Sequence, residues 1–233
     1  MSETDSDTAI AIRASDVTLS LGTQAAPVDI LRGIDLEIGS GESLAILGPS
    51  GSGKSSLMAI LSGLERASGG TVEVAGVDFT ALDEDGLARA RRGRIGIVLQ
   101  SFHLLPTMTA LENVAVPLEL AGIDDPFDVA TAELTAVGIG HRLGHYPTQL
   151  SGGEQQRVAI ARALAPGPSI VFADEPTGNL DAATGGSIID VLFERKAAAD
   201  STLVIITHDV SLAQRCDRIV EMKDGRIVSD SRP

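Results

Sequence analysis

A glycine-rich segment that ends in a lysine and a serine can bind the phosphates of a nucleotide. Residues 48–55 read GPSGSGKS, which fits the pattern G-x-x-x-x-G-K-[ST]. In such a loop the backbone N–H groups surround the phosphates, the lysine neutralises their charge, and the serine hydroxyl is a ligand for Mg²⁺. We therefore expect Lys54 and Ser55 to make the ionic contacts. The rest of the expected phosphate cradle is Gly48, Pro49, Ser50, Gly51, Ser52, Gly53 and Ser56.

The segments on either side of this loop have the patterns that a phosphate-binding loop requires. Residues 43–47 are an apolar run typical of a buried strand, and residues 55–61 have the pattern of a helix. That helix would direct the positive end of its dipole at the phosphates. A Gly/Ser-rich surface turn is the other interpretation of the motif, and the strand and helix around it favour the nucleotide site.

Two carboxylates follow another apolar run, at residues 170–173. Asp174 would hold Mg²⁺, directly or through a water molecule. Glu175 lies one residue later, where a carboxylate can orient or deprotonate the attacking water. Taken alone, the two acids could form a solvated end of a strand. Their place after a phosphate loop favours the metal-binding and catalytic roles.

Gln100 and His208 also follow apolar runs, at residues 95–99 and 203–207. Parallel strands present their carboxyl ends at one edge of a sheet, where ligands bind. There the Gln100 amide can offer an oxygen to Mg²⁺ or a hydrogen bond to the attacking water. His208 can contact the γ-phosphate or position the catalytic carboxylate. The ordinary interpretations are a polar strand end and a structural histidine.

The segment LSGGEQ, residues 150–155, has two compatible interpretations. Ser151 and Glu154 fit a capping box, which is the usual way to start a helix. Gly152 and Gly153 leave backbone N–H groups open to an approaching phosphate. Because the helix after the phosphate loop already occupies one side of the nucleotide, this second helix start would face the opposite side or the nucleotide of another molecule.

Composition narrows the functional classes. The chain has 233 residues and a formal net charge of −14, which disfavours nucleic acid as a main partner. Cys216 is the only cysteine, so no internal disulfide forms and a reducing compartment fits. The first residues do not resemble a signal peptide, and no apolar run reaches about 18 residues, so a membrane role requires a partner. Arg89, Arg91, Arg92 and Arg94 form either a solvated helix end or a contact patch.

The order of predicted elements indicates an α/β chain with an inserted helical segment. Residues 1–8 read as a disordered acidic tail. Strands are predicted at residues 10–21, 30–38, 71–75, 95–99, 169–173 and 202–206, with a final hairpin of 218–222 and 226–229. Gly22 and Pro27 would break the first two strands, which belong to an antiparallel layer, and strand 95–99 would be buried on both faces.

Helices are predicted at residues 84–92, 110–121, 126–137, 154–165 and 182–198, the first of them capped by Asp83. The fold we expect is a P-loop NTPase (RecA-like) core with an antiparallel β subdomain and an inserted α-helical subdomain. The core would comprise residues 9–100 and 166–233, and the helical subdomain about 101–165.

These motifs resemble those of the ATP-binding subunits of ABC transporters, and the resemblance covers nearly the whole chain. LSGGEQQRVAIARAL and ADEPTGNLD are similar to the lipoprotein-release and macrolide-export branch. QSFHLLPTMTALENVAVPLEL resembles members of this branch that pair with a large permease and a periplasmic thioesterase or esterase.

The resemblance implies an ATPase that uses ATP and Mg²⁺ in a head-to-tail homodimer. Each ATP would lie between the phosphate loop of one subunit and Ser151, Gly152 and Gly153 of the other. Gln100 would mark the Q-loop and a further Mg²⁺ ligand, Glu175 the catalytic carboxylate and His208 the switch histidine. Residues 179–181, including Asp181, would form the dimer-crossing D-loop.

The resemblance also implies a location and a task. The stretch after Gln100 would accept the cytoplasmic coupling helix of a membrane permease, which places the chain on the cytoplasmic face of a bacterial inner membrane. The task would be export or extraction of a lipid, a lipoprotein or a hydrophobic substrate. Mechanical or regulatory signalling through a permease-like partner is the alternative. A soluble ATPase of DNA repair or translation is disfavoured by the acidic balance and the single nucleotide motif.

The chain departs from the family pattern at one position of the nucleotide pocket. The family usually places an aromatic residue near the end of the first strand to stack on adenine, whereas residues 19–21 here read Leu-Ser-Leu. Leu21 offers apolar contact without stacking. We therefore expect weaker discrimination of ATP from GTP than in relatives that carry the aromatic residue.

Overall fold

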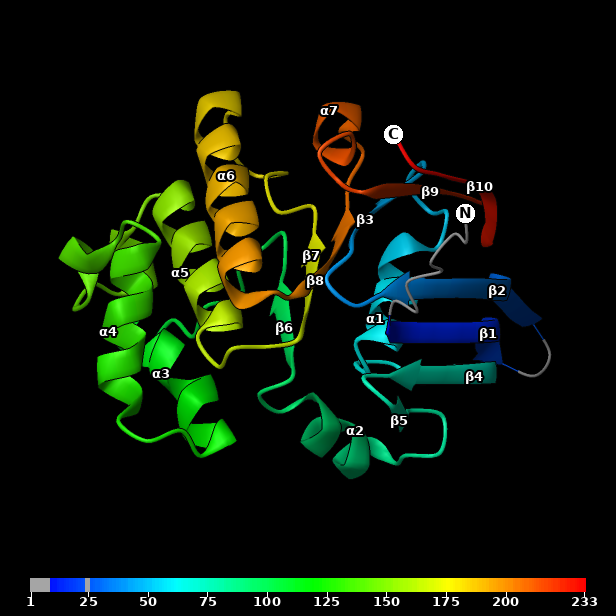
Figure 1. Cartoon of the computed structure of the whole chain (residues 1–233), viewed down its shortest axis with the longest axis horizontal. Coiled ribbons are helices and arrows are strands. Elements are labelled where there is room, and N and C mark those ends of the chain that lie inside the picture. The colour runs from blue at the N-terminus through cyan, green and yellow to red at the C-terminus, as the bar shows by residue number, and fades with distance from the viewer. Residues whose placement is uncertain (1–8, 24–25) are drawn as a thin grey trace, which may run out of the picture.

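A computed structural model describes residues 9–23 and 26–233 and arranges them around two sheets (Figure 1). The antiparallel sheet lies at one end, the helices α3, α4, α5 and α6 lie at the other, and a second sheet runs between them. The expected acidic tail, residues 1–8, lies outside the described residues. The division into core and helical subdomain at residues 101–165 remains a prediction.

The antiparallel sheet confirms the expected β layer. Its strand order is β2-β1-β4-β5, and its strands are β1 Ile10–Thr23, β2 Ala26–Gly39, β4 Gly69–Val74 and β5 Val77–Asp78. Strands β1 and β2 are longer than predicted, because Gly22 and Pro27 pair with each other in the ladder instead of ending it. A proline is tolerated there because β2 is an edge strand, where an N–H group is not needed for pairing.

The second sheet has the order β10-β9-β3-β8-β7-β6. Its strands are β3 Ser43–Leu47, β6 Ile95–Val98, β7 Ile170–Asp174, β8 Thr202–Ile206, β9 Arg218–Lys223 and β10 Arg226–Ser231. All neighbours are parallel except β9 and β10. This confirms the predicted strands and brings the carboxyl ends of β3, β6, β7 and β8 to one edge.

Alternate residues of the parallel strands enter two different cores. Leu44 and Phe172 pack with the antiparallel sheet and α1, Lys54–Leu61. Ala45 and Val171 pack with the helices on the other face. Successive side chains of a strand point to opposite faces, so a sheet covered on both sides reads as a continuous apolar run. This is why the strands that end at the site could be recognised in the sequence.

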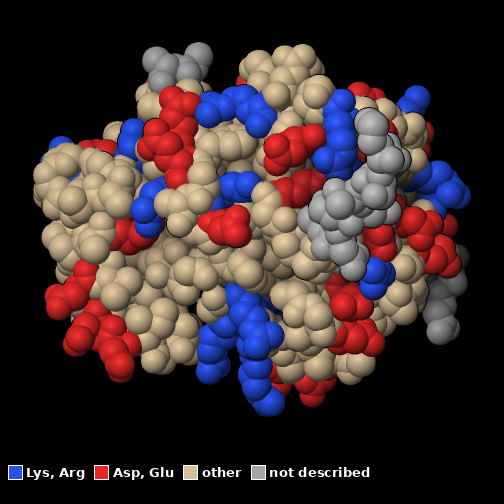
Figure 2. Space-filling model, viewed as in Figure 1, with Lys and Arg blue, Asp and Glu red and all other residues tan. Residues whose placement is uncertain are grey.

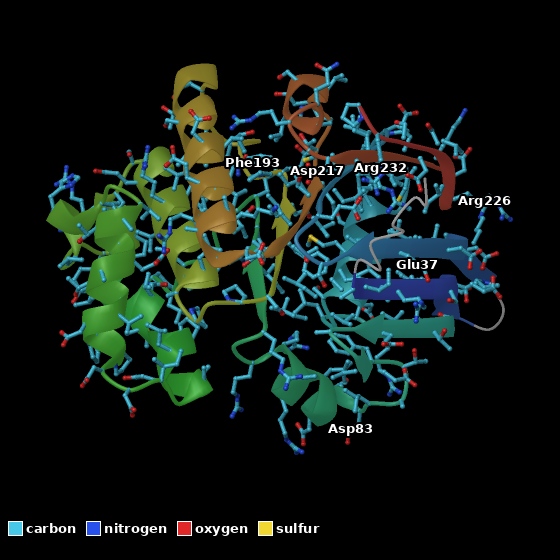
Figure 3. All side chains as sticks on the ribbon, in the orientation of Figure 1. Glu37, Asp83, Phe193, Asp217, Arg226 and Arg232 are labelled. Atoms are coloured by element: carbon cyan, nitrogen blue, oxygen red, sulfur yellow. The ribbon has the colours of Figure 1, made fainter. Side chains whose placement is uncertain are left out.

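The predicted helices are present with small shifts of their ends. They are α2 Glu84–Arg91, α3 Ala110–Ala121, α4 Pro126–Ala136, α5 Gly152–Leu164 and α6 Ala182–Ala199. Asp83 caps α2 by accepting a hydrogen bond from the Gly86 N–H at 2.8 Å, as expected, and is labelled at the lower edge of Figure 3. Within residues 9–23 and 26–233, strand β5 and the 3₁₀ turns Gly140–Arg142 and Pro147–Gln149 were not predicted, and a short helix, α7 Val210–Ala213, follows its N-cap residue Asp209.

The prediction that strand 95–99 is buried on both faces was wrong. Strand β6 is the edge strand of its sheet, with β7 as its neighbour. Val98 is fully buried, but Ile95 and Ile97 on the other face are only half-buried. They line a groove that no element of the described chain fills. An apolar run indicates that a strand is buried, but it does not indicate whether another element covers each of the two faces of that strand.

The predicted hairpin is confirmed and has an additional role. Asp224 and Gly225 form its turn with φ angles of 49° and 74°, as a two-residue type I′ turn requires. Strand β9 also pairs in parallel with β3, which the sequence pattern did not predict. The C-terminal hairpin is therefore part of the sheet that carries the phosphate loop.

Candidate nucleotide site

A cavity of about 640 Å³ contains most of the residues predicted to bind and hydrolyse a nucleotide. It lies at the carboxyl ends of the parallel strands, where ligands collect in α/β sheets. Its lining includes all nine residues of the predicted cradle, 48–56, together with Gln100, Asp174, Glu175 and His208. Ile30 also lines it, and nothing in the sequence distinguishes this residue from other strand residues.

The phosphate loop holds its lysine close to its own backbone. The Lys54 ammonium donates hydrogen bonds to the carbonyls of Gly48 at 2.8 Å and Pro49 at 2.9 Å. Helix α1 begins at Lys54, and its N-cap residue Gly53 makes no side-chain capping bond. The first N–H groups of the helix are thus available to an anion. Gly48 must be glycine, because a Cβ there would lie 2.2 Å from the Met222 carbonyl oxygen.

The expected metal ligands have the chemistry that magnesium requires. Burial raises the pKa of Asp174, a hydrogen bond with Ser55 opposes that rise, and the charge of Glu175 adds to it. Among residues 9–23 and 26–233, no group of three or more His, Cys, Asp or Glu side chains could hold a metal ion by itself. Mg²⁺ prefers one or two carboxylates completed by substrate phosphates and water. Asp174, Ser55 and Gln100 fit such a site, in which they would hold the ion against the nucleotide.

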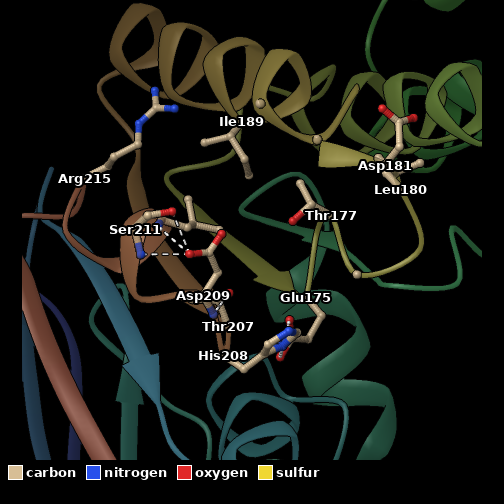
Figure 4. Close-up of a pocket in the computed structure, with 14 residues that line it drawn as sticks. Glu175, Thr177, Leu180, Asp181, Ile189, Thr207, His208, Asp209, Ser211 and Arg215 are labelled. Atoms are coloured by element: carbon tan, nitrogen blue, oxygen red, sulfur yellow. Dashed lines mark hydrogen bonds and ion pairs between the residues drawn. The ribbon is translucent and has the colours of Figure 1, made fainter. Parts of the chain in front are cut away.

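Glu175 and His208 lie side by side at the ends of β7 and β8. One Glu175 carboxylate oxygen and His208 Nδ1 are 2.9 Å apart, and Figure 4 shows the two side chains in contact. The Glu175 side chain is only 18% exposed, whereas that of His208 is 76% exposed. Glu175 has a φ of 45°, an unusual conformation for a non-glycine residue, and such conformations cluster at functional sites. This geometry can hold a carboxylate in position next to an attacking water.

A second cavity of about 500 Å³ is also lined by this pair. Glu175 and His208 line both cavities. Asp181 lines only the second one and caps α6 by accepting a hydrogen bond from the Thr184 N–H at 3.0 Å. Figure 4 shows Asp181 at the far side of this cavity from His208. The predicted D-loop residue therefore lies apart from the nucleotide cavity of its own chain.

The segment LSGGEQ, residues 150–155, starts a helix and does not line the nucleotide cavity. Ser151 and Glu154 form the expected capping box, which is confirmed. Helix α5 begins at Gly152, two residues earlier than predicted, because the cap sets its first turn. Ser151, Gly152 and Gly153 are not among the residues that line the cavity around the phosphate loop. Instead, a Cβ on Gly153 would lie 2.5 Å from the Thr184 methyl carbon.

Two links between distant segments of the site were not predicted. The Asn179 amide donates a hydrogen bond to the Gln100 carbonyl at 2.8 Å, which connects the loop after β7 to the end of β6. The Arg162 guanidinium donates to the carbonyls of Phe102 and His103 at 2.7 and 2.6 Å. Such contacts join residues far apart in sequence and have no periodic pattern that could reveal them.

Comparison with known proteins decides the family. A family model described as ABC transporter matches residues 31–178, which is more than half of the chain. The chain belongs to the ABC transporter family. As a member it is an ATPase that uses ATP and Mg²⁺. The cavity around the phosphate loop has the residues and the geometry that fit ATP and Mg²⁺.

Several relatives of this ABC ATPase are similar over most of its length. It is 52% identical over 204 residues to the lipoprotein-releasing system ATP-binding protein LolD of Anaeromyxobacter dehalogenans, covering 86% of this chain and 85% of LolD. It is 48% identical over 222 residues to the macrolide export ATP-binding/permease protein MacB of Marinobacter nauticus, covering 94% of this chain and 34% of MacB. Both relatives fit the lipoprotein-release and macrolide-export branch.

A solved ABC structure has the same fold. The ATP-binding cassette MJ0796, described as a dimer in a post-hydrolysis state bound to ADP and Pi, is 37% identical and superposes with a TM-score of 0.88. The match covers 95% of this chain and 98% of that one. Within the described part of this ABC ATPase, no helix combines the length and apolar character needed to cross a membrane.

Proposed function

We propose that this ABC ATPase is the ATP-hydrolysing subunit of a system that exports or extracts a lipid, a lipoprotein or a hydrophobic substrate through a membrane permease. The observation that carries the proposal is the 52% identity with LolD of Anaeromyxobacter dehalogenans over most of both chains. The chain would act as a homodimer bound peripherally to the cytoplasmic face of a bacterial inner membrane through its permease.

The proposed cycle assigns a task to each part of the site. In a head-to-tail dimer, the phosphate loop of one subunit and residues 151–153 of the other would hold the same ATP. The capped α5 N-terminus supports this arrangement, because it offers N–H groups to an anion but does not line the cavity of its own chain. Glu175 would orient or deprotonate water, with His208 holding it in position. Loss of phosphate would remove the contact across the dimer and let the subunits separate.

The permease is proposed to bind near the stretch after Gln100, and a periplasmic thioesterase or esterase would join through the permease. Mechanical or regulatory signalling without cargo remains the second candidate, because the site described above would serve either task. Purification of the tagged chain from native membranes, with identification of the bound permease, tests the proposal. Reconstitution in vesicles then distinguishes ATP-dependent cargo movement from ATP-dependent activation of a periplasmic enzyme. Failure to purify with any membrane protein would contradict both.

Gly153 offers a test of the proposed phosphate contact. We expect Gly153→Ala to lower ATP hydrolysis, since its methyl group would strike the Thr184 side chain and crowd the N–H groups of α5. Thr184→Ser removes the methyl carbon that is struck. If the Gly153→Ala methyl group also blocks the approach of the phosphate, the double variant Gly153→Ala/Thr184→Ser should regain thermal stability. Its ATPase rate should nevertheless stay at least about tenfold below that of the wild type, as expected for the loss of a hydrogen bond to a charged group. Full recovery of the rate would show that Gly153 serves internal packing alone.

Leu21 offers a test of base recognition. Leu21 is 49% exposed, and its partner residue in the β1–β2 ladder is Val28, which is also exposed. Val28 lies two residues before Ile30, which lines the nucleotide cavity. Leu21→Tyr is expected to tighten ATP binding roughly 5- to 150-fold, because stacking a base on an aromatic ring contributes about 1–3 kcal/mol. Fluorescent ATP and GTP titrations measure affinity and preference, with Val228→Tyr on exposed β10 as control. Unchanged affinity and preference in Leu21→Tyr would refute the proposed place of the base.

A further inference from the structure

A fully buried glutamine on helix α5 connects this helix to the loop that begins at Glu175. Figure 2 shows charged side chains spread over the surface of the molecule, whereas Gln156 lies inside, with an exposed fraction of 0%. Its Nε2 group donates a hydrogen bond to the Pro176 carbonyl at 2.7 Å, and Pro176 directly follows Glu175. Gln156 lines neither the nucleotide cavity nor the second cavity. It can therefore act on the reaction only through the residues that it holds.

The amide oxygen of Gln156 has no hydrogen-bond partner within residues 9–23 and 26–233. A buried carbonyl oxygen without a partner lowers the stability of the folded state. A methionine has nearly the same size and would fill this place without that cost. Stability alone does not account for a glutamine at this position, so the contribution of the amide lies in the bond from its nitrogen to Pro176.

Three hydrogen bonds hold the backbone around Glu175. The Glu175 N–H donates to the Ile206 carbonyl of β8 at 2.9 Å, and the Glu175 carbonyl accepts from the Gly178 N–H at 2.9 Å. The third bond is the one from Gln156 to the next carbonyl, that of Pro176. Glu175 has a φ of 45°, and such a conformation persists only where its surroundings hold it. The bond from Gln156 thus helps to set the direction of the Glu175 side chain.

The position of α5 does not depend on this one bond. Arg157, the next residue, donates to the Val137 carbonyl at 2.7 Å and to the Ser187 hydroxyl at 3.2 Å. The apolar side chains of the same helix are buried in the core. Removal of the Gln156 amide would therefore leave the helix in place and release the Pro176 carbonyl.

We propose that Gln156 is a positioning residue for ATP hydrolysis, which holds the Pro176 carbonyl and thereby keeps the Glu175 carboxylate directed at the attacking water. The inference rests on the proposed function, in which Glu175 orients or deprotonates that water. A general base works within hydrogen-bond reach of the proton that it takes, about 2.6–3.2 Å. A displacement of about 1 Å can lower a rate about 100-fold. Gln156 acts through Glu175 and not by contact with the nucleotide.

Gln156→Met tests the proposal, because it removes the amide and keeps the size of the side chain. We expect the kcat of ATP hydrolysis to fall roughly 10- to 100-fold, while KM and the affinity for fluorescent ATP change less than about twofold. The melting temperature should shift by less than about 4 °C, since the variant loses one hydrogen bond but also removes the unpaired oxygen. An unchanged kcat would overturn the proposal.

Ser201→Ala is the matched control, because it also removes a buried side-chain bond to a proline carbonyl. The Ser201 hydroxyl donates to the Pro168 carbonyl at 2.6 Å, before the start of β7, whereas Pro176 follows the end of that strand. We expect Ser201→Ala to keep the wild-type kcat within about twofold. An equal fall of kcat in both variants would show that any lost bond around β7 has this effect, and would overturn the role of Gln156.

A second variant covers a failure of Gln156→Met to fold, which circular dichroism would reveal. Gln156→Asn keeps the amide, but its side chain is one CH₂ group shorter and does not reach the Pro176 carbonyl. The same fall of kcat is expected in this variant. A folded Gln156→Asn with wild-type kcat would overturn the proposal.

The dependence on Glu175 is measured with a double variant. If Gln156 acts through Glu175, Gln156→Met should change the residual kcat of Glu175→Gln by less than about twofold, because both losses then have one cause. A further fall as large as in the wild-type background would overturn the proposal. Wild-type kcat in Glu175→Gln alone would contradict the proposed role of Glu175 and this inference with it. Slow hydrolysis by Glu175→Gln together with an unchanged kcat in Gln156→Met would contradict the role of Gln156 alone.

The dimer formed with ATP distinguishes a misplaced carboxylate from a damaged α5. A variant that binds ATP but hydrolyses it slowly should collect as an ATP-bound dimer. Light scattering in the presence of ATP and Mg²⁺ should therefore give Gln156→Met at least as large a fraction of dimer as the wild type. A smaller fraction would show that the substitution disturbs residues 151–153, and would overturn the role assigned to Gln156.

Discussion

Glu175→Gln is expected to bind ATP as tightly as the wild type and to hydrolyse it about 10²- to 10⁴-fold more slowly, the usual contribution of a general base. The amide has the size of the carboxylate but cannot accept a proton from water. Glu175 lies 2.9 Å from His208 and is held in a left-handed backbone conformation. The substitution therefore removes the base while leaving its surroundings in place.

The same variant should collect as a dimer in the presence of ATP and Mg²⁺. If the γ-phosphate joins two subunits, ATP that is not hydrolysed keeps them together, and size-exclusion chromatography with light scattering reports their mass. Glu194→Gln is the matched control, because Glu194 is exposed on α6. Hydrolysis by Glu175→Gln at the wild-type rate would show that another group acts as the base.

Lys54→Met is expected to weaken ATP binding roughly 10- to 150-fold, the effect of losing a hydrogen bond to a charged group. The Lys54 ammonium donates hydrogen bonds to the carbonyls of Gly48 and Pro49. A phosphate offers it a charged partner at the same place, whereas methionine keeps the length of the side chain without the charge. Titration of fluorescent ATP measures the change.

Stability must be separated from binding in this variant, because Lys54 also holds its own loop. Thermal unfolding without nucleotide reports the loss of the two bonds to Gly48 and Pro49. Lys223→Met, on the exposed side of β9, removes one positive charge away from the cavity and serves as control. ATP affinity equal to that of the wild type in Lys54→Met would exclude a phosphate contact by this lysine.

The fold and the clustered part of the site could be predicted because their signals are local. A sheet covered on both faces produces continuous apolar runs, and Gln100, Asp174 and His208 follow such runs directly. Their shared sheet edge follows from the parallel arrangement alone. The capping residues Asp83 and Ser151 were recognisable for the same reason, since a cap acts within three residues of its own position.

The remaining features depend on contacts between distant segments. The half-buried face of β6 could not be predicted, because an apolar run does not reveal whether another element covers it. The contact between Gly153 and Thr184 and the bonds of Arg162 to the loop after Gln100 join separate elements. The closed dimer is a property of two chains, so a single sequence indicates it only through the family resemblance.

The parallel pairing of β3 with β9 has a consequence for the order in which the protein matures. Gly48 packs against the Met222 carbonyl, and the Gly225 N–H donates to the Ser52 carbonyl at 3.1 Å. The phosphate loop precedes these contact residues by more than 160 positions, because they belong to β9 and to the turn that follows it. During synthesis the loop can be completed only after the C-terminal hairpin has left the ribosome, because non-local pairing waits for both partners. Nucleotide binding would thus report on a chain that has been made at least as far as this hairpin.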